Sequence, residues 1–135
     1  MAIDFSLSAE QRELRREARD FARTHLSAVA GICRQQTDPQ TRFAATQSIY
    51  AEMVRAGYLR RIFPKAVGGD SEGMLDFAIL AEEFMAVDVN VPLTMFACML
   101  GLSPLLFGGT PDQIARWMPQ FLDGSGTPLA AFGFS

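Results

Sequence analysis

The residues best suited to acid–base chemistry are the adjacent carboxylates Glu82 and Glu83 and the single histidine, His25. Neighbouring residues on a helix point about 100 degrees apart, so we do not expect the two carboxylates to face one site. We expect them at a surface or at a helix end. His25 falls near the end of an expected helix, where an imidazolium suits the helix dipole, and no acid stands at an informative spacing from it. These residues therefore predict no acid–base pair.

The cysteines and the glycine pairs also lack the spacing of known sites. Cys33 and Cys98 form neither a disulfide framework nor a metal-ligand pattern, and Cys98 is interpreted as a small core residue. Gly68-Gly69 and Gly108-Gly109 lack the pattern of phosphate-binding loops and predict turns. So few cysteines indicate a reducing, intracellular compartment, with the cytoplasm as the default.

A stripe of large apolar side chains allows two interpretations. Its members recur at helical spacing and are Met95, Phe96, Met99 and Leu100. Such a stripe is typical of a core. The same segment carries Thr94 and Ser103 as isolated polar groups, as apolar ligand pockets often do. From the residues alone, core and pocket both remain open.

The elements that must position these residues are helices. Capping residues and apolar periodicity predict helices over 8–26, 42–56, 74–86, 92–107 and 110–123. The first begins at a capping box of Ser8 and Gln11, and the last at Thr110. Gly57 is expected to be left-handed after the second helix, and residues 58–70 to be irregular. The helix over 92–107 is apolar nearly all round, so we expect it to be central.

The final run, residues 128–135, is apolar and β-prone, and nothing else in the sequence is expected to pair with it. A single strand leaves its backbone N–H and C=O groups unpaired. We therefore expect an all-helical domain over 1–127 and the first strand of a β-domain over 128–135. The other strands would belong to the remainder of a truncated protein or to another chain.

Composition narrows the class of protein. With 135 residues, 49% hydrophobic and 20% charged, the chain is expected to form a globular domain. Its net charge of −3, with acids interleaved among the arginines of the first helix, gives no nucleic-acid footprint. The apolar stretch 91–107 is short for a bilayer and contains Pro92 and Pro104, so no membrane span is expected. The N-terminus lacks the features of a secretory signal.

Six segments, in order along the chain, resemble the acyl-CoA dehydrogenase superfamily. They are residues 4–11 (DFSLSAEQ), 52–59, 63–69 (FPKAVGG), 80–84, 100–106 and 128–135. Within that superfamily, residues 42–46, 82–87, 97–104 and 124–130 most resemble the nitroalkane oxidase branch. Together these segments extend over essentially the whole chain.

The resemblance implies an N-terminal helical domain followed by a middle β-domain and a C-terminal helical domain, with FAD bound where they meet. It implies that the N-terminal domain covers one side of the flavin and substrate cavity and that the protein is a homo-oligomer of the tetramer type. It places Phe132, Phe134 and Ser135 at the flavin. It places one helix at the substrate pocket, with the residues Thr94, Met95, Cys98, Met99 and Leu102.

In complete enzymes of the superfamily, a carboxylate removes an acidic C–H proton while reducing equivalents pass to the flavin. That carboxylate belongs to the C-terminal domain, so we expect no catalytic residue here and no tight FAD binding by this chain alone. The substrate, whether an acyl-CoA, a nitroalkane or another carbon acid, is left open. Two alternatives remain: a non-catalytic helical module that binds a sheet-bearing partner protein, and a carrier of apolar ligands.

Overall fold

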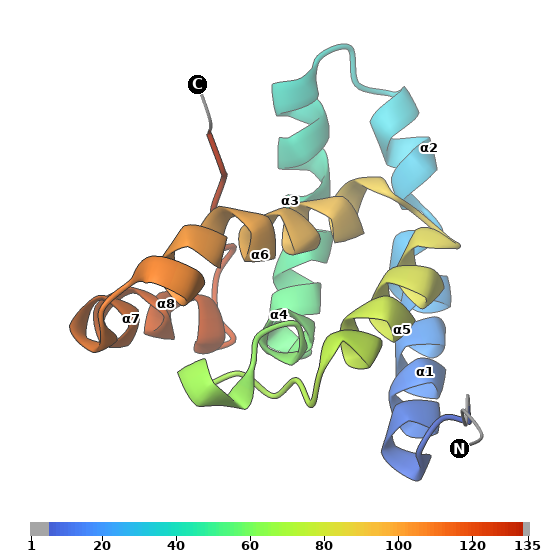
Figure 1. Ribbon diagram of the computed structural model, residues 1–135. Helices are drawn as coiled ribbons and strands as arrows, with labels where there is room; N and C mark the ends of the chain where they lie inside the picture. Colours follow the sequence, from blue (N-terminus) through green and yellow to red (C-terminus); the bar gives the residue numbers. More distant parts are fainter. Residues whose placement is uncertain (1–5, 134–135) are drawn as a thin grey trace.

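The computed structural model describes residues 6–133 and shows a bundle of helices, with no strand in this range (Figure 1). The elements are α1 (Ala9–Phe21), the π-helical turn η1 (Ala22–Leu26), α2 (Val29–Arg34), α3 (Pro39–Arg55), α4 (Tyr58–Arg61), the 3₁₀ turn η2 (Lys65–Val67), α5 (Met74–Met85), α6 (Asn90–Gly108), α7 (Pro111–Trp117) and α8 (Pro119–Leu122). The predicted all-helical class is confirmed.

Three helix ends lie where local chemistry predicted them, whereas α3 begins at Pro39 rather than at residue 42. At the start of α1 the Gln11 amide donates to Ser8 Oγ at 3.2 Å, and the Ser8 amide donates to Gln11 Oε1 at 3.0 Å. Thr110 and Gln113 make the same reciprocal pair at α7. Gly57 follows α3 with φ +86°, the left-handed conformation expected there.

Other boundaries differ from the prediction. The segment of α2 has no side-chain cap and was not predicted, and α4 and η2 are short turns within the region expected to be irregular. The last predicted helix is two helices, α7 and α8. It divides before Pro119, because proline lacks an N–H donor and restricts the residue that precedes it.

The core lies between α1, α3, α5 and α6; in Figure 1, α6 runs across α3 and α5 lies beside α1. Its largest members are almost fully inaccessible to solvent and include Tyr50, Met53, Phe63, Phe84 and Met95. The expectation that the 92–107 helix is central is correct for one face of α6 only. Its other face leaves Leu93 54%, Leu100 59% and Phe107 90% exposed.

By length and composition, α6 is the one helix in the described chain that could cross a membrane. The core helix of a soluble protein passes the same test. The inward face of α6 packs in the core of this bundle, and this packing accounts for the apolar residues on that face.

The described part of the terminal run, residues 128–133, contains no strand. A strand needs neighbours for its hydrogen bonds, and no neighbouring strand exists within residues 6–133. The segment lies instead against α3 and α6. The rest of the expected strand, residues 134–135, lies outside the described residues.

Candidate functional site

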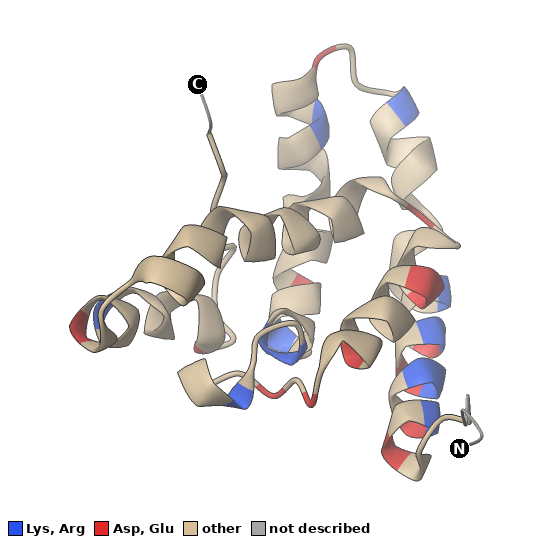
Figure 2. Cartoon of the chain, in the orientation of Figure 1, with Lys and Arg blue, Asp and Glu red and all other residues tan. Residues whose placement is uncertain are grey.

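An apolar groove of about 470 Å³ runs between α6, α3 and the terminal segment. Its lining residues are Phe43, Asn90, Leu93, Thr94, Ala97, Leu129, Ala130 and Ala131. A more polar hollow of about 270 Å³ shares Phe43, Asn90 and Thr94 with it and adds Arg42. No charged residue occurs in α6, and Figure 2 shows its ribbon uncoloured while charges crowd α1. The site is therefore an uncharged trough with one cationic group near its polar end.

The five predicted pocket residues do not share one surface. Thr94 lines both hollows. Met95, Cys98 and Leu102 are buried in the core, and Met99 is partly buried against it. Their role as a substrate pocket stays a prediction.

The groove residues on α6 that sequence reasoning missed are Asn90, Leu93 and Ala97. Because the whole helix is apolar, its sequence did not distinguish the inward face from the outward one. The hydroxyls of Thr94 and Ser103 donate to backbone carbonyls of their own helix, at 3.3 Å to Asn90 and 2.7 Å to Leu100. The Ser103 bond serves the carbonyl that Pro104, which lacks an N–H, cannot reach.

Of the three residues predicted to contact a flavin, Phe132 is described and is 48% exposed, while Phe134 and Ser135 lie outside the described residues. Within residues 6–133, no hydrogen bond is made by the backbone amides of 129–133. An exposed ring beside free amide donors fits contact with the edge of a flavin ring. The segment carries no cation for the phosphates of a dinucleotide, so FAD would need further groups.

A buried tyrosine fixes the terminal segment. The Tyr50 hydroxyl donates to the Pro128 carbonyl at 2.7 Å and lies 3.4 Å from Cys98 Sγ. Burial raises the pKa of Tyr50, so the phenol keeps its proton for this bond. At the start of the segment, the Gln47 side-chain amide donates to Thr127 Oγ1 at 3.0 Å.

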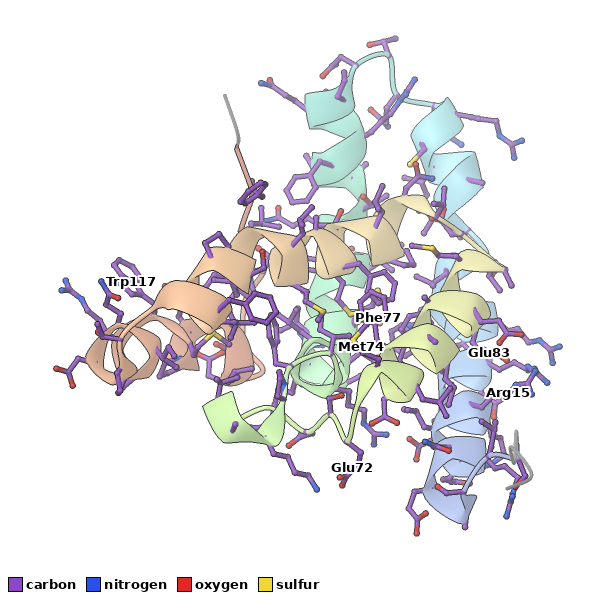
Figure 3. All side chains as sticks on the ribbon, in the orientation of Figure 1. Arg15, Glu72, Met74, Phe77, Glu83 and Trp117 are labelled. Carbon is purple, nitrogen blue, oxygen red and sulfur yellow. The ribbon has the colours of Figure 1, made fainter. Side chains whose placement is uncertain are left out.

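Glu83 lies in the last turn of α5, near the helix end as expected of the Glu82-Glu83 pair, but it is buried rather than at the surface. Its side chain is 6% exposed because α5 turns it toward α1, where it accepts from Arg15 Nε at 2.8 Å and from Arg19 Nε and Nη2 at 2.7 Å (Figure 3). The Arg19 hydrogen bonds lower the pKa of Glu83, although burial opposes them. Glu82 is 68% exposed, as expected. A carboxylate held in its charged form by two arginines is an ion-pair link between helices.

His25 has an acid partner that sequence spacing did not reveal. Its Nδ1 lies 2.7 Å from Glu52 Oε2 on α3, and its ring stacks on Phe21 with centroids 4.4 Å apart. Neither His25 nor Glu52 lines the groove. This pair links η1 to α3.

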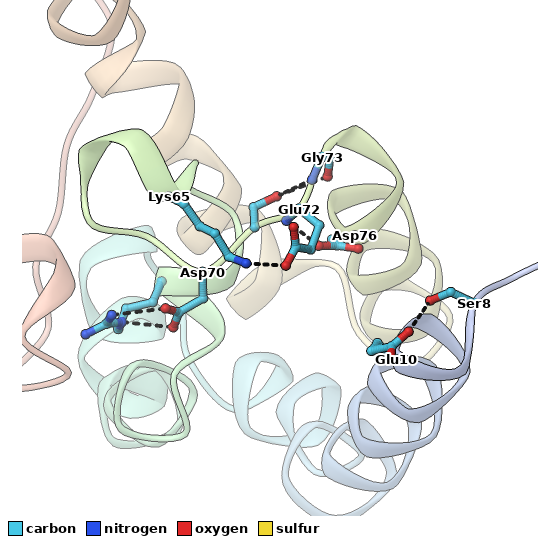
Figure 4. A network of polar contacts seen from close by, with 9 residues as sticks. Ser8, Glu10, Lys65, Asp70, Glu72, Gly73 and Asp76 are labelled. Carbon is cyan, nitrogen blue, oxygen red and sulfur yellow. Dashed lines mark hydrogen bonds and ion pairs between the residues drawn. The ribbon is translucent and has the colours of Figure 1, made fainter.

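A polar hollow of about 410 Å³ beside the start of α1 collects four carboxylates. Each is engaged: Glu10 with Ser8, Asp70 with Arg60, Glu72 with Lys65, and Asp76 with the Glu72 amide (Figure 4). In residues 6–133, no group of three His, Cys, Asp or Glu residues is placed to hold a metal ion. The contacts of Asp70, Glu72 and Asp76 hold the loop between η2 and α5.

Comparison with known proteins identifies the fold. A profile of the acyl-CoA dehydrogenase N-terminal domain family matches residues 8–125, and the chain belongs to this family. Nitroalkane oxidase of Fusarium oxysporum is 36% identical over 96% of this chain and 29% of its own length. Nitroalkane oxidase of Podospora anserina is 39% identical over 100% of this chain and 31% of its own length.

A solved nitroalkane oxidase, an active-site variant crystallised with 1-nitrooctane, superposes with a TM-score of 0.90 at 36% identity, covering 95% of this chain and 30% of that one. The chain therefore spans about 30% of the length of these relatives. The resemblance to the superfamily and to its nitroalkane oxidase branch is confirmed.

Proposed function

We propose that this chain is the N-terminal domain of an FAD-dependent oxidoreductase of the nitroalkane oxidase type. In this proposal it covers one side of the flavin and substrate cavity, with a boundary between residues 127 and 128. The observation that supports it is the match to nitroalkane oxidases along the whole chain, at 36–39% identity. The longer protein would be a soluble, cytoplasmic homo-oligomer.

The groove suits the apolar part of a substrate. Its trough is lined by aliphatic and aromatic side chains such as Leu93, Ala97 and Phe43, which would accept an alkyl chain. The solved relative was crystallised with 1-nitrooctane, which has such a chain. Arg42 lines the polar hollow, where its positive charge would suit an anionic or strongly polar head group.

The described residues supply binding surface rather than the reacting base. None of the residues that line the groove or its polar hollow is a carboxylate, and Glu83 is engaged by two arginines elsewhere. The proton acceptor for a carbon acid would therefore lie in the longer protein. The flavin would accept the reducing equivalents, with Phe132, Phe134 and Ser135 at its edge.

A domain exchange tests this proposal. The matching N-terminal 30% of Fusarium nitroalkane oxidase is replaced by this chain, and the chimera is assayed for bound FAD by visible absorbance and for oxidation of 1-nitrohexane and 1-nitrooctane. We expect FAD retention and activity on both. The control replaces the same segment with that of the Podospora enzyme. A chimera that folds and assembles like this control but holds no FAD would refute the proposal.

FAD titration of the chain alone adds a second check. Because this chain would supply only an edge contact, we expect no stoichiometric FAD to survive gel filtration. Tight binding by these 135 residues would contradict the claim that most of the cofactor site lies elsewhere.

The exposed apolar face of α6, with Leu93, Leu100 and Phe107, favours one second candidate: a non-catalytic module that binds a sheet-bearing partner protein. Gel filtration and affinity capture separate the two. A stable complex with a sheet-bearing protein, together with an inactive chimera, would favour the module. A monomer without a partner would exclude it.

A further inference from the structure

We propose that Tyr50, Cys98 and Gly101 form a seat for residues 127–133, and that Tyr50 is the positioning residue that sets where this segment presents Phe132. The contacts of the seat all lie within the described chain. Its consequence for the flavin rests on the proposed function.

Tyr50 holds the segment at Pro128, one residue after the hydrogen bond from Gln47 to Thr127. Pro128 has no backbone N–H, so its carbonyl is its only polar group, and that carbonyl accepts from the Tyr50 hydroxyl at 2.7 Å. Tyr50 is 1% exposed, so water cannot replace the bond without opening the core. Cys98 Sγ, fully buried, lies 3.6 Å from the same carbonyl. The Tyr50 bond is therefore the strong hydrogen bond to this oxygen, and the single S–H of Cys98 lies within reach of this carbonyl and of the Thr94 carbonyl, 3.4 Å away.

Gly101 allows the backbone of the segment to approach α6 closely at Ala130, two residues after Pro128. A Cβ on Gly101 would lie 2.6 Å from the Ala130 carbonyl carbon and 2.7 Å from the Ala131 nitrogen. These are backbone atoms, which cannot move aside as a flexible side chain could. Glycine is otherwise unfavourable within a helix such as α6, so the close approach of the segment gives this position a structural reason.

The contacts come from two helices and follow the segment in order. Gln47 of α3 holds Thr127, Tyr50 of α3 holds Pro128, and Gly101 of α6 admits the backbone of 130–131. Phe132 follows directly and is half exposed. The direction in which the chain leaves the bundle is therefore set by Tyr50 and Gly101.

The test uses ¹⁵N relaxation of the 135-residue chain, with two variants that each remove one part of the seat. Tyr50→Phe deletes only the hydroxyl, and Gly101→Ala introduces only the clashing methyl. The matched controls are Tyr58→Phe, whose hydroxyl donates to the Glu17 carbonyl at 3.2 Å, and Gly108→Ala, whose Cβ meets nothing within 4 Å.

We expect order parameters of about 0.85 for amides 129–133 in the parent chain and in both controls. In Tyr50→Phe and Gly101→Ala they should fall below about 0.6, while the helices keep their values. Equal order in all five proteins would overturn the seat, as would a parent chain already below about 0.6 in this segment.

Cysteine alkylation gives an independent readout. Cys98 is fully buried beneath the segment's anchor, and Cys33 is partly exposed. Release of the segment should accelerate alkylation of Cys98 at least tenfold, an expected magnitude for the loss of about 1.4 kcal/mol of protection. Cys33 should react at an unchanged rate and serves as the internal reference. Acceleration of both cysteines would indicate global loosening and refute a local seat.

The flavin consequence is tested in the chimera with Fusarium nitroalkane oxidase. Tyr50→Phe should weaken FAD binding about two- to tenfold, the range for one hydrogen bond, and Tyr58→Phe should not. Released amides with unchanged FAD affinity would refute the positioning role. A parent chimera without FAD would refute the proposed function and leave the relaxation result as the test of the seat.

Discussion

Replacement of Glu83 by glutamine should destabilise this domain more than any other single loss of charge described above. The Glu83 side chain is 6% exposed and accepts three short hydrogen bonds from Arg15 and Arg19. Glutamine keeps the shape but removes the charge, and its amide N–H₂ would face guanidinium donors. The substitution therefore tests the ion pair with little change in packing.

The magnitude follows from which groups lose their partners. A hydrogen bond to a charged group contributes about 1.5–3 kcal/mol, and breaking a fully buried pair costs about 3–5 kcal/mol. The Arg15 and Arg19 side chains are 42% and 41% exposed, so water can solvate them in the variant. We therefore expect Glu83→Gln to lower the free energy of unfolding by about 2–3 kcal/mol and the melting temperature by about 6–10 °C.

The assay is urea denaturation followed by far-ultraviolet circular dichroism, at several pH values. The folded-state pKa of Glu83 lies below its ordinary value of 4.5, so its contribution is full above pH 4.5 and is lost as the pH falls toward the folded-state pKa. The difference between the parent and Glu83→Gln should therefore shrink as the pH falls below 4.5.

Glu82→Gln is the matched control. Glu82 is 68% exposed and lies 3.6 Å from Arg15, so this change should cost no more than about 0.5 kcal/mol. Equal losses from the two variants, or a Glu83→Gln loss that does not depend on pH, would show that the buried charge does not link α1 to α5.

Three further predictions concern local features. Gly57→Ala should cost about 1–2 kcal/mol in urea denaturation because φ is +86°, whereas Gly31→Ala in α2 should be neutral or stabilising; equal effects would contradict the left-handed turn. Thr110→Ala should cost about 1 kcal/mol through the lost cap of α7, and Thr110→Ser should retain it; identical stabilities would show that the cap is not formed. Leu100 is 59% exposed, so Leu100→Lys should change the unfolding free energy of the chain alone by less than about 0.5 kcal/mol. The same substitution should prevent assembly of the chimera with Fusarium nitroalkane oxidase. A Leu100→Lys chimera that retains its FAD in full would show that this face of α6 stays uncovered.

The features that sequence predicted well are local ones. A capping box needs two residues three positions apart, so Ser8 with Gln11 and Thr110 with Gln113 could be identified without any tertiary information. Gly57 is similar, because the left-handed turn after a helix favours glycine on steric grounds alone. These positions set the ends of α1, α3 and α7.

The features that sequence did not predict depend on distant contacts. Arg15 and Arg19 precede Glu83 by 68 and 64 residues, so no spacing rule could join them. The same holds for His25 with Glu52, and for Tyr50 with the Pro128 carbonyl 78 residues later. The side-chain types indicated charge or polarity, but only the packing of α1 on α5, and of the terminal segment on α3, determined their partners.

Core and groove are not exclusive alternatives for the apolar helix α6, because its two faces differ. A helix that is apolar all round has two faces to cover, and α6 buries Met95, Cys98 and Leu102 in this domain while Leu93 and Leu100 face outward. The inward residues pack α6 into the core, and Cys98 also contacts the terminal segment. On the outward face, Leu93 lines the groove and Leu100 is exposed to solvent. A substitution at Cys98 should thus act on the groove through the position of residues 128–131, and one at Leu93 should act on it directly.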